Sequence, residues 1–114
     1  MTVRDIVEAL QLEVLGGDQG LDREVTGGYA SDLLSDVIAN SRAGDLWVSL
    51  QAHRNIIAVA SLKELAGVVL VGGRAPDSET LAKAREEQVL LLGSRLPAFE
   101  VVGRLYALGL RGAG

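Results

Sequence analysis

The stretch that decides the fold spans residues 45–73 and reads DLWVSLQAHRNIIAVASLKELAGVVLVGG. Its two ends, residues 46–50 and 67–71, are short runs rich in aliphatic side chains, and each predicts a buried strand. Residues 55–66 lie between them and predict a helix with four buried apolar side chains: Ile56, Val59, Ala60 and Leu62. A strand, a helix and another strand in this order predict a βαβ unit with parallel strands.

The same alternation continues toward the C-terminus. Residues 76–88 predict a polar helix opened by Pro76 and Asp77, residues 89–92 predict a strand, and residues 97–108 predict another helix. Four side chains of the last helix share one face: Phe99, Val102, Leu105 and Tyr106. Repeated units of this kind predict an α/β fold, a three-layer sandwich with a mostly parallel central sheet.

The segment before residue 45 predicts shorter elements. Thr2 and Asp5 have the spacing of a capping box at the start of an amphipathic helix. Strands are expected at residues 12–15 and 25–29. A second helix should be capped by Ser31 and end before a left-handed Gly44.

The composition fits one small domain with an aliphatic core. The chain has 114 residues, of which 48% are hydrophobic and only 4% aromatic, and it has no cysteine. We expect a single domain over residues 1–110 and a disordered tail at residues 111–114. The lack of cysteine excludes disulfides and thiolate metal centres, and we expect neither a metal nor another cofactor.

Charge and hydropathy argue against two kinds of partner. The net charge is −4 without a cluster of Lys or Arg. Nucleic acid is therefore not expected to bind, because neutralising phosphates dominates that affinity. No apolar run approaches the length of a membrane span, and the first residues lack a signal-peptide pattern, so a cytoplasmic protein is expected.

Three of the predicted loops that follow strands each carry one arginine: Arg54, Arg74 and Arg95. Such loops share the edge of a parallel sheet where α/β proteins bind ligands. Guanidinium groups and helix N-termini both suit phosphate or carboxylate, which predicts an anion site. Further candidates for that site are His53, Ser94, Gly27, Gly28 and Gly73. The alternative is that polar residues simply populate exposed turns.

Evidence for catalysis is sparse. His53 is the only histidine, so it cannot build a metal site with a second imidazole. No Gly-x-Ser-x-Gly elbow surrounds a serine, and Gly72-Gly73 lacks the Gly-Lys-Ser/Thr ending of a phosphate-binding P-loop. An enzyme that uses His53 as a general base is therefore the third hypothesis, behind two non-catalytic ones.

The segment LDREVTGG, residues 21–28, resembles the signature of DRTGG domains, with Glu24 and Val25 inserted after Asp22-Arg23. Residues 44–48, GDLWV, also look like that family. The resemblance implies an α/β module similar to the N-terminal domain of HPr kinase/phosphorylase, with a fold like that of the first domain of Mur ligases. It further implies a regulatory or dimerising role, and for stand-alone versions an association with iron-hydrogenase or another metabolic enzyme.

Two leading hypotheses follow. The first is a non-catalytic regulatory or assembly module that homodimerises and acts on a partner enzyme, since a mean hydropathy of +0.26 leaves apolar surface for a partner. The second is a small-molecule sensor that binds a nucleotide or another phosphorylated anion at the carboxyl edge of the sheet. The two are compatible.

Overall fold

The central sheet is almost entirely parallel. In the computed structural model, which describes residues 1–112, it has five strands in the order β1-β5-β4-β3-β2. Strands β2 to β5 run parallel, whereas β1 is antiparallel to β5. The strands are β1 (Glu13–Gly16), β2 (Gly27–Ala30), β3 (Asp45–Ser49), β4 (Gly67–Leu70) and β5 (Leu91–Gly93).

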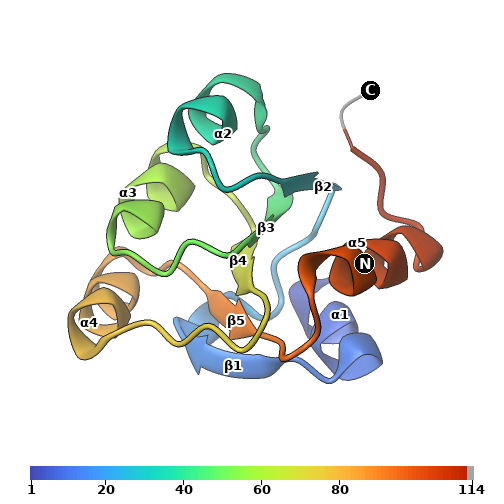
Figure 1. The fold of residues 1–114 in the computed structure, drawn as a ribbon, viewed down its shortest axis with the longest axis horizontal. Coiled ribbons are helices and arrows are strands. Elements are labelled where there is room, and N and C mark those ends of the chain that lie inside the picture. Colours follow the sequence, from blue (N-terminus) through green and yellow to red (C-terminus); the bar gives the residue numbers. More distant parts are fainter. Residues whose placement is uncertain (113–114) are drawn as a thin grey trace.

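Helices cover both faces of this sheet. Figure 1 shows α2 (Leu34–Asn40), α3 (Asn55–Leu62) and α4 (Ser78–Glu87) on one side, and α1 (Val3–Leu10) and α5 (Ala98–Ala107) on the other. A short 3₁₀ helix, η1 (Asp18–Gly20), follows β1. The predicted three-layer α/β sandwich with a mostly parallel sheet is confirmed. Among the described residues, no helix is both long and apolar enough to cross a membrane.

Two apolar clusters fill the space between the layers. Along β3, Leu46 and Val48 belong to the cluster beneath α1 and α5, while Trp47 belongs to the cluster beneath α2, α3 and α4. Successive strand residues point to opposite faces, so a strand buried on both sides must be apolar throughout. Trp47 is a core residue: it is fully buried, and its Nε1 donates to the Ser31 carbonyl at 2.8 Å.

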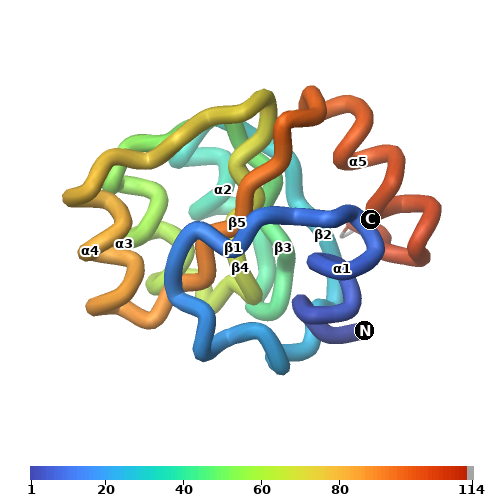
Figure 2. Tube along the Cα trace, turned by 90° about the horizontal axis from the view of Figure 1, so that it is seen from below, coloured from blue at the N-terminus to red at the C-terminus, as the bar shows by residue number. Residues whose placement is uncertain are grey.

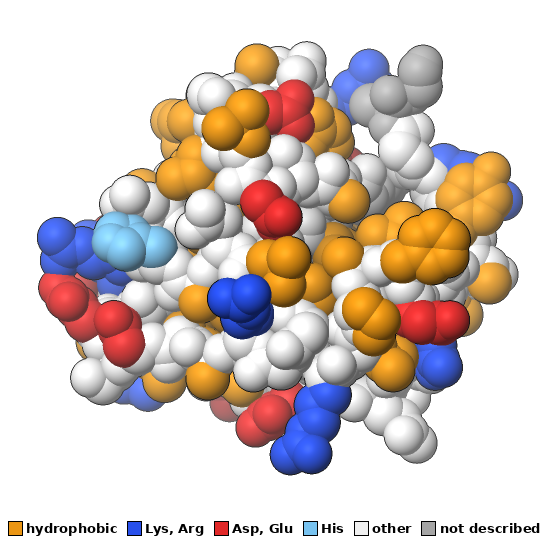
Figure 3. Space-filling model, viewed as in Figure 1, with side chains coloured by type: hydrophobic (Ala, Val, Ile, Leu, Met, Phe, Trp, Pro, Cys, Tyr) orange, Lys and Arg blue, Asp and Glu red, His pale blue; other side chains and the backbone are white. Residues whose placement is uncertain are grey.

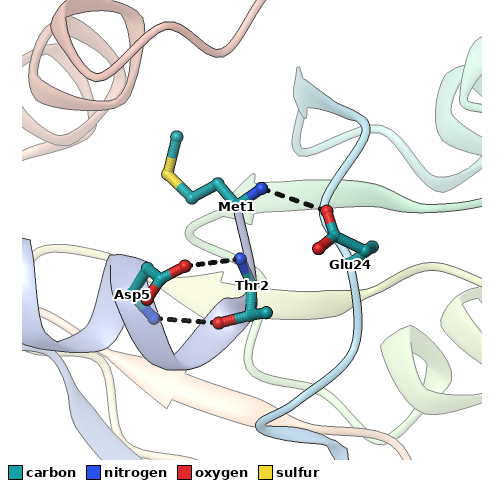
Figure 4. Close-up of polar contacts among 4 residues, drawn as sticks. All are labelled: Met1, Thr2, Asp5 and Glu24. Atoms are coloured by element: carbon teal, nitrogen blue, oxygen red, sulfur yellow. Dashed lines mark hydrogen bonds and ion pairs between the residues drawn. The ribbon is translucent and has the colours of Figure 1, made fainter.

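The first helix begins at the predicted capping box (Figure 4). Thr2 Oγ1 accepts from the Asp5 amide at 3.3 Å, and Asp5 Oδ2 accepts from the Thr2 amide at 2.9 Å. The bond from the Thr2 amide lowers the pKa of the Asp5 carboxyl. The Met1 amino group pairs with Glu24 at 3.0 Å, and the Val25 amide donates to the Met1 carbonyl at 2.9 Å. These contacts join the start of α1 to the segment that precedes β2.

Two local predictions around α2 and α3 are wrong, and a third is confirmed. Leu62 is 69% exposed, because the buried face of α3 is formed by Ile56, Ile57, Val59 and Ala60 and Leu62 lies off that face. Ser31 does not cap α2, since its Oγ accepts from the Leu33 amide at 3.2 Å and the helix begins only at Leu34, with Leu33 in the N-cap position. The prediction for Gly44 is confirmed: it is left-handed, with φ of 86°, and α2 ends before it, at Asn40.

The start of α4 also differs from the sequence prediction. Pro76 lies outside the helix, and Asp77 caps it by accepting from the Thr80 amide at 2.8 Å. The remaining element boundaries shift by one or two residues, as is usual where the ends of helices and strands fray.

The predicted disordered tail requires correction at its first residue. Arg111 Nη1 donates to the carbonyls of Tyr106 and Leu110, and its guanidinium carbon lies 3.7 Å from the centroid of the Tyr106 ring. The Arg111 carbonyl accepts from the Gly28 amide at 3.2 Å. These contacts hold Arg111 against β2 and α5, while residues 113–114 lie outside the described part of the chain.

Replacing Leu92 by alanine should lower the free energy of unfolding by about 2–5 kcal/mol, because Leu92 is fully buried in the sheet. Leu62→Ala is the matched control and should change it by no more than about 0.5 kcal/mol, since Leu62 projects into solvent. Urea unfolding followed by circular dichroism measures both. Equal losses in the two variants would contradict the described core.

Candidate functional site

The chain changes sides of the sheet after β5. The connections from β2 to β3, β3 to β4 and β4 to β5 pass through α2, α3 and α4, which all cover one face. The chain leaves β5 toward α5, which covers the opposite face. The loops after the neighbouring strands β4 and β5 therefore diverge, and such a divergence opens a crevice at the carboxyl edge of a parallel sheet.

A cavity of about 570 Å³ lies at this divergence. The two diverging loops form one wall of it, and four of the candidate residues line that wall: Gly73, Arg74, Ser94 and Arg95. We call the cavity the β4–β5 groove. The structure thus brings together half of the residues that the sequence assigned to an anion site.

The opposite wall comes from the start of the chain. Glu13 pairs in register with Gly93, so the beginning of β1 lies beside the end of β5. Figures 1 and 2 both show β1 next to β5. Leu10, Glu13 and Leu15 reach the groove from this side, and Arg104 reaches it from α5. Sequence reasoning missed these residues, because no motif signals which strand pairs with β5.

Backbone hydrogen bonds tie the two loops to each other. Gly72 and Gly73 are both left-handed, with φ of 66° and 70°, a conformation that favours glycine. The Gly72 amide donates to the Leu96 carbonyl at 2.8 Å, and the Gly73 amide donates to the Ser94 carbonyl at 2.9 Å. The N–H of Gly73, a candidate for the anion site, is therefore already bonded within the chain. What the glycines supply is the turn that leads to Arg74.

The groove carries an excess of positive charge. Arg104 Nε is paired with Glu100 at 3.4 Å. Arg74 and Arg95 are exposed, and within residues 1–112 neither has a carboxylate within 4.0 Å. Two guanidinium groups that form no ion pair within the described residues suit an anionic ligand, since each presents a planar fork of donors.

Arg54 and His53 lie elsewhere on the carboxyl edge. Arg54 forms an ion pair with Glu79 of α4, and the groove lining includes neither Arg54 nor His53. His53 Nδ1 accepts from the Asn55 amide at 3.2 Å. Of the three loop arginines, Arg74 and Arg95 thus line the groove and Arg54 does not, because its loop follows β3, which is separated from β5 by β4.

The N-terminus of α4 is likewise occupied from within the chain. The Asp77 carboxylate accepts from the Thr80 amide, and this bond is the main cause that lowers the pKa of Asp77. The nearby His53 and Arg54 act in the same direction. The sequence assigned the free N–H groups of this helix to a bound anion, but Asp77 takes that position.

Gly27 and Gly28 lie at the other end of the sheet. Gly27 begins β2 opposite Asp45, the first residue of β3, so it sits at the amino edge rather than the carboxyl edge. A Cβ on Gly27 would lie 2.7 Å from Asp45 Oδ1 and 3.0 Å from the Arg111 carbonyl. Close packing therefore accounts for Gly27, and neither glycine lines the groove.

The rest of the DRTGG-like segment is also structural. Asp22 pairs with Arg4 Nε at 3.0 Å, and Arg23 Nη1 donates to the Leu65 carbonyl at 2.8 Å. The segment thus connects α1, β2 and the loop before β4. It identifies a fold without contributing to the groove.

The chain is similar in fold to a solved structure of the CBS and DRTGG domains of the regulatory region of Clostridium perfringens pyrophosphatase, complexed with its activator, diadenosine tetraphosphate. The TM-score is 0.70 at 12% sequence identity, and the match covers 91% of this chain and 45% of that one. This chain therefore spans less than half of the length of that structure. No family model and no curated protein matches the sequence. The structural likeness confirms the DRTGG-like fold that residues 21–28 predicted.

Asp77→Ala should lower the free energy of unfolding at neutral pH, because the Thr80 amide loses its acceptor. The pKa of Asp77 is lower in the folded than in the unfolded chain, so the folded state takes up this proton less readily. The stabilisation is therefore present above the ordinary pKa of Asp and is lost as the pH falls through the lowered value.

Urea unfolding at stepwise lower pH tests this expectation. The difference between the wild type and Asp77→Ala should shrink on acidification. Asp77→Asn is the control, since its amide oxygen still caps the helix but does not titrate. A wild-type advantage over the alanine variant that stays constant down to acid pH would refute the assignment.

Proposed function

We propose that this chain is a cytoplasmic, non-catalytic regulatory module that binds a phosphorylated anion in the β4–β5 groove. The observation that carries the proposal is the presence of Arg74 and Arg95 without counter-charges on one wall of a groove at the carboxyl edge. Its volume of about 570 Å³ falls within the range of small-molecule sites.

The similar solved structure supports a regulatory role. It belongs to the regulatory region of a pyrophosphatase, and it holds a phosphorylated activator. A module of this kind acts by binding its ligand more tightly in one state of a larger assembly than in another. The arginines would supply binding energy, and no bond-breaking step is required of any residue in the groove.

Arg74→Ala and Arg95→Ala should each weaken the binding of phosphorylated probes by roughly tenfold, the effect of losing a charge-assisted hydrogen bond. Isothermal titration calorimetry with pyrophosphate, ADP, ATP and diadenosine tetraphosphate measures this. Arg54→Ala is the control, because it removes a positive charge from the same sheet edge but outside the groove. The affinity of this variant for the probes should stay within about twofold of the wild-type affinity, since Arg54 belongs to an exposed ion pair.

Two outcomes would refute the proposed site. If none of the four probes binds, the groove is not an anion site. If Arg54→Ala weakens binding as much as Arg74→Ala, the effect is general electrostatic attraction rather than contact in the groove.

We further propose that the chain homodimerises through α5. Phe99 is 90% exposed and Tyr106 is 58% exposed, and both lie on one side of the helix with Val102. Figure 3 shows hydrophobic side chains gathered over α5 on the right of the view. Between them lies Gly103, where an added Cβ would meet no atom within 4 Å. An apolar stripe with a glycine at its centre allows a second helix to approach closely.

Phe99→Lys should therefore shift the chain toward monomer in sedimentation velocity, because it places a charge in the apolar stripe. Leu62→Lys is the control, since Leu62 is also an exposed apolar residue but lies on α3. A wild-type chain that stays monomeric at high concentration refutes the dimer. Loss of dimer in both variants refutes the assignment to α5.

The partner enzyme implied by the DRTGG resemblance, an iron-hydrogenase or another metabolic enzyme, stays a prediction. So does the enzymatic alternative, in which His53 acts as a base. The observations favour neither over the regulatory module, because His53 lies outside the groove.

A further inference from the structure

Glu13 places a carboxylate in a groove that otherwise attracts anions. It is exposed at the start of β1, opposite Gly93 in the sheet, and so lies next to the loop that carries Ser94 and Arg95. Within residues 1–112 it forms no ion pair, although three arginines line the same groove. Its charge repels a bare phosphate, since unit charges a few ångströms apart interact appreciably even near a protein surface.

A ligand that fits this arrangement carries hydrogen-bond donors as well as phosphate. An ionised carboxylate only accepts hydrogen bonds, so the group beside Glu13 must offer an O–H or N–H. Hydrogen bonds with an ionised partner are the stronger ones. Glu13 therefore favours a phosphate ester with free hydroxyls over inorganic phosphate or pyrophosphate.

The groove also has an apolar part that inorganic phosphate cannot cover. Leu10 and Leu15 line it from the first helix and strand, and Leu96 lines it from the loop after β5. Small-molecule sites typically combine such apolar walls with a few polar groups that fix orientation. The flat group of a ligand would cover the half-buried Leu15 and Leu96, whereas Leu10 is already buried.

From these three features we propose that the β4–β5 groove selects nucleoside phosphates. The phosphates bind Arg74 and Arg95, a ribose hydroxyl donates to Glu13, and the base packs on the leucine side chains. The proposal rests on the proposed anion-binding function and adds the class of ligand. It also assigns Glu13 as the residue that distinguishes a nucleotide from a plain polyphosphate.

Calorimetry with pyrophosphate and ADP tests the proposal, because both probes carry two phosphates and only ADP carries ribose and base. The wild type should bind ADP at least about tenfold more tightly than pyrophosphate. In Glu13→Ala, ADP should bind more weakly and pyrophosphate more tightly, so that the preference falls below about threefold. Glu8→Ala removes the same charge from an exposed position on α1 outside the groove and should keep the wild-type preference.

A change on the ligand side avoids any effect of a mutation on folding. The 2′,3′-dideoxy analogue of ADP lacks both ribose hydroxyls. For the wild type, the affinity of the analogue should be about tenfold lower than that of ADP. For Glu13→Ala, the analogue and ADP should bind with the same affinity.

The outcomes separate this inference from the proposed function. If pyrophosphate binds the wild type as tightly as ADP does, the nucleotide class is overturned and the anion site stands. If ADP is preferred but Glu13→Ala leaves the preference unchanged, the role of Glu13 is overturned. If neither probe binds, the proposed function itself fails.

Discussion

A parallel sheet must be covered on both faces, and the rest of this structure depends on how the chain meets that requirement. Crossovers between neighbouring parallel strands are right-handed, so α2, α3 and α4 necessarily cover one face. The other face is left to the two ends of the chain, which supply α1 and α5. The change of side after β5 occurs beside the β4–β5 groove, whose opposite wall comes from the start of the chain.

This arrangement divides the polar residues of the carboxyl edge into two groups. Next to α3 and α4, the charged side chains contact other groups of the chain. Arg54 forms an ion pair with Glu79, and Asp77 caps α4. Where the loops diverge, Arg74 and Arg95 have no such partner among the described residues. The paired and the unpaired arginines of this sheet edge therefore lie beside different strands.

The DRTGG-like segment shows how a motif can identify a fold without marking a site. Gly27 is required because Asp45 and the Arg111 carbonyl leave no room for a side chain. Arg23 binds the Leu65 carbonyl, which fixes the segment to the loop before β4. Gly27 and Arg23 therefore contribute to packing at the amino edge of the sheet, whereas the groove lies at the carboxyl edge.

The sequence by itself determined the order and type of most elements, because apolar spacing, Thr2 with Asp5 and the turn glycines act within a few residues of the chain. It also indicated Arg74 and Arg95, which directly follow strands. Only the tertiary structure decided that Arg54 pairs with Glu79, that Leu62 faces solvent, and that Glu13 lines the groove. These depend on strand order and on the antiparallel pairing of β1 with β5, contacts between residues far apart in the sequence that no local pattern encodes.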